Sequence, residues 1–163
     1  RQTKARDAAL ETIERIIEEQ NLLSNKLLVI KLDSFAADRN LTGLIANQLM
    51  AKYQRPVLLL NKVVNEDGKI TWEGSGRGYE ISSTNDWRAF IEASGYCMYA
   101  EGHPNAFGIG IKDKNMAAFI EHCDKELYMI NGDINYDVDF IWNAKTLNGD
   151  NIISIANFKY LWG

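Results

Sequence analysis

The sequence contains few of the residues that build metal centres and disulfide frameworks. Its 163 residues include only two histidines, His103 and His122, and two cysteines, Cys97 and Cys123. They form neither a Cys-x-x-Cys nor a His-x-x-x-His pair, so a structural zinc site is not expected. The scarcity of cysteine indicates a reducing, cytoplasmic setting rather than a disulfide-stabilised secreted domain.

Long apolar runs and an excess of positive charge are also missing. No apolar run approaches the roughly 18 residues of a membrane helix, and no signal-peptide core is recognisable, so we expect no membrane association. Lys and Arg number 18 against 22 Asp and Glu, which gives a net charge of −4. Non-specific nucleic-acid binding depends on an excess of Lys and Arg. Any phosphate site in this chain is therefore expected to be local.

The remaining composition is typical of a globular domain. Hydrophobic residues make up 46% of the chain and charged residues 25%, which argues against a disordered or fibrous protein. Domains of about 150 residues are common, so the length indicates one fold with its own core. The chain begins at Arg1 rather than Met, and we expect that a longer protein contains it.

Hydrophobic periodicity predicts alternating helices and strands. The expected helices cover residues 3–23, 40–52, about 84–94, with Thr84 or Asn85 as cap, 115–129, and a short one within 148–162. The expected strands cover residues 26–32, 57–64, 69–72, 96–99, 107–111 and 134–142. The Asp67-Gly68 pair predicts a tight hairpin between the second and third strands. Together these elements predict an α/β fold, a mixed β-sheet flanked by helices.

A glycine-rich stretch, Gly74-Ser75-Gly76-Arg77-Gly78, follows the third expected strand. Glycines at positive φ can converge their amides on a phosphate, and a serine hydroxyl and an arginine fork add charge-assisted bonds. Tyr79 stands where a dinucleotide-binding loop needs its third glycine, and no P-loop lysine is present. The stretch is therefore either a phosphate nest or a surface turn.

A second stretch, Glu101 to Gly108, places His103 between a glycine and a proline. In a constrained turn an imidazole can donate to a phosphate oxygen or act as an acid or base near neutral pH. A lone loop histidine is also compatible with an ordinary surface residue, so the stretch alone leaves both interpretations open.

Two other patterns are interpreted as structural. Acidic residues recur at calcium-loop spacing after Asp133, but Val138 replaces the loop glycine and Ala144 replaces the final glutamate. We interpret them as the solvated face of a strand. The His122-Cys123 pair lies on an expected helix without a base or an orienting partner, which indicates helix packing rather than a catalytic dyad.

The order of four motifs resembles a known family. They are Thr42-Gly43-Leu44-Ile45-Ala46 at a helix start, Arg55-Pro56-Val57-Leu58 at a strand start, Gly74-Ser75-Gly76-Arg77, and Gly102-His103-x-x-Ala106-x-Gly108. This order resembles the DHH-associated domain of the DHH phosphoesterase superfamily, in particular of RecJ-like single-stranded-DNA-specific exonucleases. The similarity covers residues 27–130.

The resemblance implies a division of the chain and a partner domain. In the family, an N-terminal DHH domain holds catalytic manganese or magnesium through Asp and His, and the associated domain closes over the substrate. Residues 1–24 would then be a connector helix from that missing domain, and residues 25–163 the associated domain. Residues 136–163 resemble the stretch that leads toward an oligonucleotide-binding barrel. No Asp-His-His motif occurs in the sequence, so we expect neither bound metal nor cleavage by this chain alone.

The resemblance also implies a set of site residues. Ser75 and Arg77 would hold a phosphate of the DNA strand at its 5′ end, and His103 would contact, and could assist at, the phosphate beside the metals. The implied phosphate-binding set is Gly74, Ser75, Gly76, Arg77, Gly102 and His103, with Arg39 and Asn40 as an added backbone contact. Gly78 and Glu101 depart from the family pattern, which has Ser and Gly there.

The implied function is substrate recognition within a metal-dependent exonuclease. The chain would bind single-stranded DNA or a short oligonucleotide for a phosphodiester hydrolase of DNA repair and recombination that digests from the 5′ end. Two alternatives stay open. The first is a related phosphodiesterase for oligonucleotides or cyclic dinucleotides, and the second is a non-catalytic nucleic-acid-binding module.

Overall fold

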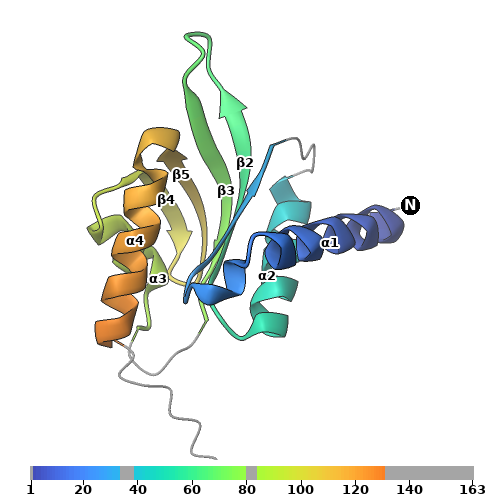
Figure 1. The fold of residues 1–163 in the computed structure, drawn as a ribbon, viewed down its shortest axis with the longest axis horizontal. Helices are drawn as coiled ribbons and strands as arrows, with labels where there is room; N and C mark the ends of the chain where they lie inside the picture. Colours follow the sequence, from blue (N-terminus) through green and yellow to red (C-terminus); the bar gives the residue numbers. More distant parts are fainter. Residues whose placement is uncertain (1, 34–38, 80–83, 131–163) are drawn as a thin grey trace, which may run out of the picture. The chain divides into compact units, whose positions relative to one another are not determined.

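The computed structural model describes residues 2–33, 39–79 and 84–130 (Figure 1). All of them belong to the first of the chain's two compact units, residues 1–133. The expected strand over 134–142, the acidic pattern after Asp133 and the expected helix within 148–162 lie outside these residues. Within the described ranges, no helix is both long and apolar enough to cross a membrane.

The helices and strands alternate as the sequence predicts. The helices are α1 (Gln2–Glu19), α2 (Arg39–Tyr53), α3 (Trp87–Ala93) and α4 (Asp113–Ile130), with a short 3-10 turn at Leu22–Ser24. The strands are β1 (Leu28–Leu32), β2 (Val57–Val64), β3 (Ile70–Arg77), β4 (Cys97–His103) and β5 (Ala106–Lys112). They form one five-stranded sheet in the order β1-β2-β3-β5-β4.

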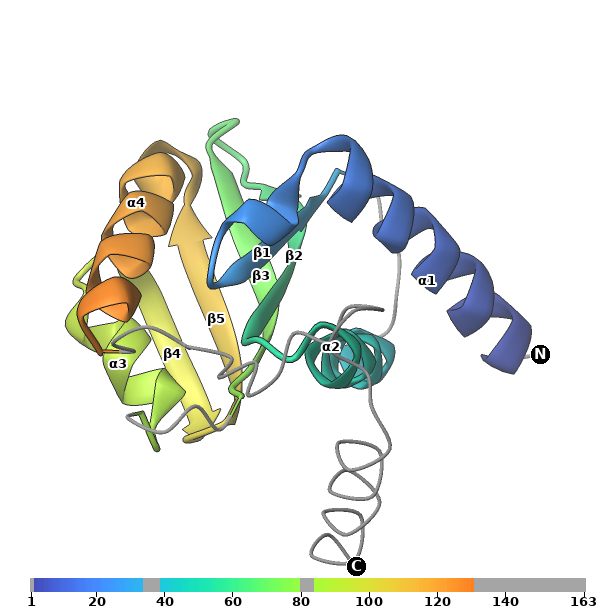
Figure 2. The same ribbon diagram turned by 60° about the horizontal axis from the view of Figure 1, so that its bottom comes forward.

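The sheet is mixed, which confirms the predicted fold class. Only β1 and β2 run parallel, joined by the α2 crossover, and the other neighbouring strands pair antiparallel. Helices α3 and α4 lie on one side of the sheet, and α1 and α2 lie on the other (Figures 1 and 2). This is the layering expected when a strand sequence is interrupted by amphipathic helices.

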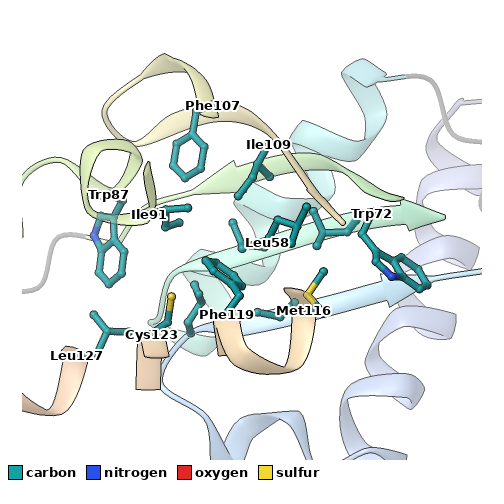
Figure 3. Close-up of a cluster of buried hydrophobic side chains, with 14 residues drawn as sticks. Leu58, Trp72, Trp87, Ile91, Phe107, Ile109, Met116, Phe119, Cys123 and Leu127 are labelled. Carbon is teal, nitrogen blue, oxygen red and sulfur yellow. The ribbon is translucent and has the colours of Figure 1, made fainter. Parts of the chain in front are cut away.

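Each side of the sheet has its own hydrophobic core. On the α3 and α4 side, Phe119 and Leu127 of α4 belong to one buried cluster with Phe107, Ile109 and other strand residues (Figure 3). On the α1 and α2 side, the buried residues come from β1, β2 and the two helices. For strands β3, β5 and β4, we call the side covered by α3 and α4 the apolar side and the opposite side the polar side.

Helix α1 contributes to the second core. Its Ala9, Ile13 and Ile17 are buried with residues of β1 and α2. The spacing of four residues places all three on one face of the helix, as the periodicity predicts. The helix is therefore packed in the same compact unit as the sheet, while its role as a connector stays a prediction.

Three local expectations are wrong. The stretch Gly74–Arg77 is neither a nest nor a turn, because it is the second half of β3 and none of its glycines has positive φ. Strand β4 continues past the expected end at residue 99 to His103, so only Pro104 and Asn105 form the turn. Helix α3 is capped by Asp86, whose side chain accepts from the amide of Ala89, rather than by Thr84 or Asn85.

Candidate phosphate-binding site

The glycine motif of β3 presents its two polar side chains on the polar side of the sheet. Strand residues alternate between the two sides, so Ser75 and Arg77 share one side and Gly74 and Gly76 the other. A Cβ built on Gly43 of α2 would lie 2.5 Å from Arg77 Nη2 and 3.8 Å from Ser75 Oγ. The start of α2 therefore lies directly against the guanidinium, and a side chain at position 43 would displace it.

Gly76 packs closely against the core. Its Cβ would lie 2.4 Å from a ring carbon of Phe107, which belongs to the core on the apolar side. Gly74 likewise faces this side and is closely approached by the backbone of β2. The close approach that the two glycines allow in this structure is thus to the protein's own residues, and their expected part in phosphate binding stays a prediction.

Arg77 is a partly buried cation without a carboxylate partner in the described part of the chain. Its Nη1 donates to the Gly76 carbonyl at 2.7 Å. Burial lowers the pKa of the guanidinium, which nevertheless stays charged because arginine ionises far above neutral pH. Desolvation without an ion pair leaves this charge available for an external anion.

His103 lies at the end of β4, immediately before the two-residue turn. The preceding Gly102 has a φ of 130°, a conformation that favours glycine, and its Cβ would meet the Ala106 carbonyl oxygen at 2.9 Å. Gly102 thus shapes the hairpin that carries the histidine. The imidazole itself belongs to an exposed residue.

The register of the sheet brings the two sequence motifs together. Ala106 of β5 pairs with Arg77 of β3 on one flank and with His103 of β4 on the other. Directly paired residues point to the same side of a sheet, so the arginine and the histidine stand on either side of one small residue. Two strand spacings separate their backbones by roughly 10 Å.

A cavity joins the arginine and the histidine. It has a volume of about 750 Å³ and is lined by Arg77, Gly78, Tyr79, Asn85, His103, Pro104, Asn105 and Ala106, with Asn47 and Met50 from α2. Asn105 Oδ1 is buried there without a hydrogen-bond partner in the described structure. An arginine fork, an imidazole and amide groups around one cavity form a set that can hydrogen-bond a phosphate and its attached groups.

The remaining expected residues lie elsewhere. Ser75 lies two residues before Arg77 on β3, beside Gly43, and Gly102 pairs with Phe107 of β5. Arg39 and Asn40 form the first turn of α2, and their side chains lie outside what the structure describes. The structure therefore brings Arg77 and His103 into one cavity with Gly78, and does not do so for Gly74, Gly76 or Gly102.

Sequence reasoning missed the contribution of α2 and of the turn. Gly43, Asn47 and Met50 lie far from both motifs in the chain, and Asn105 is an ordinary turn residue in sequence. The only signal was the Thr42-Gly43 helix start within the resemblance. A helical glycine costs stability, so its presence points to close packing against another group.

The described residues do not gather a metal site. Among them, no group of three His, Cys, Asp or Glu side chains lies close enough to hold an ion. Both residues of the His122-Cys123 pair pack against other side chains, as the sequence predicts. Cys123 is buried in the core beside α3, and burial raises its pKa to about 12. His122 stacks at an angle near Tyr96, with ring centroids 5.7 Å apart.

Comparison with curated proteins gives two close matches, while no family model matches the chain. One is named as the SPbeta prophage-derived single-strand DNA-specific exonuclease YorK of Bacillus subtilis (strain 168), and the other as the single-strand DNA-specific exonuclease yorK of Bacillus phage SPbeta. Both are 36% identical over 165 aligned residues that cover the whole of this chain. The chain spans 28% of the length of each relative.

Comparison with solved structures identifies the fold. The structure of RecJ from Thermus thermophilus, determined in complex with Mn²⁺, matches with a TM-score of 0.53 and 19% identity. The match covers 77% of this chain and 17% of RecJ. The expected resemblance is confirmed: the chain shares the fold of a segment of RecJ, and its sequence is related over its whole length to a segment of proteins named single-strand DNA-specific exonucleases.

Proposed function

We propose that this chain is the substrate-recognition part of a RecJ-like, metal-dependent exonuclease that degrades single-stranded DNA from its 5′ end. Arg77 and His103 bind one phosphate of the strand, and Ser75 adds a hydroxyl beside it. The observation that carries the proposal is the shared cavity, because two motifs separated in sequence meet there across Ala106.

The chemistry of the cavity suits a phosphate. The guanidinium offers a planar set of donors that matches phosphate oxygens, and its charge is not already used by a carboxylate of the described residues. His103 adds a ring N–H donor from the opposite side, and can place a proton at the phosphate that is cleaved. Position and charge are what this chain supplies to the reaction.

Hydrolysis itself requires groups from outside the described residues. Manganese or magnesium, held by a DHH domain elsewhere in the longer protein, supplies the activated water in this proposal. Residues 1–24 form the connector to that domain. This chain alone binds the strand and does not cleave it.

The test is a binding titration of the chain with a 5′-phosphorylated oligothymidylate. Charge-assisted hydrogen bonds are worth about 1.5–3 kcal/mol, so Arg77→Ala weakens binding roughly ten- to hundredfold. Arg77→Lys recovers only part of the loss, since it keeps the charge and loses the fork. Arg6→Ala on α1, which replaces a partly exposed arginine that pairs with Asp7, is the control and leaves binding unchanged.

A second assay connects binding to degradation. In the intact exonuclease that contains this segment, Arg77→Ala and His103→Ala each slow the degradation of single-stranded DNA. Undiminished rates in both variants contradict the proposal. Preference of the intact enzyme for very short or cyclic substrates favours a related phosphodiesterase, and binding without any cleavage favours a non-catalytic module.

A further inference from the structure

Beyond the cavity the polar side of the sheet continues along β5, and we call the strip from Ala106 to Lys112, with its flanking residues on β3 and β4, the trough. Along β5, the residues that face this side after Ala106 are Gly108, Gly110 and Lys112, because alternate residues share a side. Ala106 and the two glycines carry at most a methyl group. Side chains of β3 and β4 stand on the two flanks, paired across β5 in successive rows.

The flanks of the trough are polar. The first row pairs Ser75 with Glu101 across Gly108, and the next pairs Glu73 with Tyr99 across Gly110. The Tyr99 hydroxyl reaches over Gly110 and donates to Glu73 Oε2 at 3.2 Å. A Cβ at position 110 would lie 2.4 Å from the Tyr99 ring, so the absence of a side chain at Gly110 allows the ring to lie close to the β5 backbone.

A second cavity closes the far end of the trough. It has a volume of about 520 Å³, and its lining includes Thr71, Lys112, Lys69, Lys114 and Met98. The row Thr71 and Lys112 is the next pair after Glu73 and Gly110, so this cavity lies one row beyond the hydrogen bond between Tyr99 and Glu73. From Ala106 to Lys112 the strand spans roughly 20 Å at about 3.3 Å per residue.

The second cavity is a local concentration of positive charge in an acidic chain. Three lysines line it together with one carboxylate, Asp113, which already accepts from Trp72 Nε1 at 2.6 Å. Lys69 has a loose contact of 3.8 Å with Asp67, and Lys112 and Lys114 have no ion pair within the described residues. The chain as a whole carries a net charge of −4.

We propose that a single nucleic-acid strand bound at Arg77 and His103 continues along β5 and places a second phosphate at the cavity of Lys69, Lys112 and Lys114. The inference rests on the proposed function of the first cavity. Charge complementarity selects the occupant, because both ends of the trough are cationic. Glu73 and Glu101 repel phosphates from the middle, where bases and sugars lie instead.

The distance between the two ends sets a length requirement. About 20 Å corresponds to roughly six nucleotides at the stacked spacing of about 3.4 Å, and to fewer if the strand is extended. This distance also exceeds the Debye length of about 8–10 Å in physiological salt, so the lysines act on the phosphate beside them and not on the first cavity. A dinucleotide therefore does not reach the lysines, and a dodecanucleotide does.

The experiment compares 5′-phosphorylated dithymidylate with dodecathymidylate, titrated into the isotope-labelled chain and followed by amide chemical shifts. The longer probe shifts amides at both ends of the trough, and the shorter probe only those around Arg77 and His103. The triple variant K69A/K112A/K114A weakens binding of the longer probe about tenfold. It lowers the salt slope by about 0.7, the value for one lost single-strand phosphate contact.

The control is a second triple variant with the same change in net charge. K52A/K62A/K125A removes three lysines that each pair with a carboxylate, Glu14, Asp33 and Glu121 respectively. This control variant weakens binding of both probes only slightly, through a non-specific loss of charge. The K69A/K112A/K114A variant leaves the affinity for the dinucleotide unchanged.

The outcomes separate this inference from the proposed function. If Arg77→Ala weakens binding of both probes and the two triple variants behave alike, the proposed path of the strand along the trough is wrong and the phosphate site at Arg77 stands. If the lysine variant weakens both probes equally, the lysines act as general charge and the trough is also wrong. If neither probe shifts the amides around Arg77, the proposed function fails and the inference fails with it.

Discussion

The two sides of strands β3, β5 and β4 are built from the same three stretches of chain and have opposite characters. On the apolar side, Trp72, Phe107 and Ile109 are buried beneath α3 and α4. On the polar side, one residue away in each strand, stand Arg77, His103 and small residues of β5. In the proposed function, core residues and phosphate-binding residues alternate along the same strands, so the binding residues stand on a rigid support.

If the proposed function is right, the residues that stabilise the fold and those that bind the strand occupy alternate positions along β3, β5 and β4. Changes on the apolar side should act on unfolding, because they remove packed volume. Changes on the polar side should act on binding, because few of its groups are buried. Four measurements test this division, and one of them addresses a polar-side residue where we expect the division to fail.

The largest effect is expected for Phe119→Ala on α4. Phe119 is fully buried on the apolar side, and the truncation leaves a cavity that close-packed neighbours cannot fill. The free energy of unfolding should fall by about 3–5 kcal/mol, measured by urea denaturation. Leu44→Ala, which truncates a side chain of 60% exposure on α2, is the control. A loss below that range would mean that α4 is loosely packed.

The next largest effect is expected for Gly110→Ala, on the polar side. The new methyl group would lie 2.4 Å from the Tyr99 ring, so the ring must move and its bond to Glu73 is lost. Overpacking of this kind costs about 1–3 kcal/mol of unfolding free energy. Tyr99→Phe removes the bond but keeps the ring, and should cost less. Equal losses in both variants would show that the bond, not the ring position, matters.

Alkaline pH should weaken the apolar side through Cys123. Burial raises the pKa of this thiol to about 12 from an ordinary value of about 9, so the unfolded chain releases its proton first. The contribution to stability is therefore full below pH 9 and declines as pH rises toward 12. Between pH 9 and 10 the loss is about 1 kcal/mol. Cys123→Ala should flatten this decline in urea unfolding series, and an unchanged slope would rule out this thiol as its source.

The smallest effect on stability is expected for His103→Ala. The residue is exposed at the end of β4, and surface substitutions change unfolding free energy by less than about 0.5 kcal/mol. Binding of a phosphorylated oligonucleotide should nevertheless weaken. Thermal unfolding and a binding titration of the same preparation make the comparison. Loss of stability in parallel with loss of binding would show that the polar side supports the fold as well.

The sequence was sufficient for most of the fold because its periodicity reports burial. The run from Val57 to Val64 was placed without error, since a mainly apolar strand followed by an Asp-Gly turn has few alternatives. The glycine stretch, in contrast, was wrongly predicted to lie outside the strand. Glycine has no side chain to report burial, so Gly74 and Gly76 looked like a loop although partner strands fix them on both edges.

The candidate site was predictable only as two separate halves. The chemistry of Arg77 and His103, their order in the chain and the family resemblance could all be read from the sequence. Their meeting across Ala106, the cavity wall from α2 and the trough to the lysines depend on strand order and register. These are set by packing between residues distant in sequence, and local periodicity carries no information about which strands become neighbours.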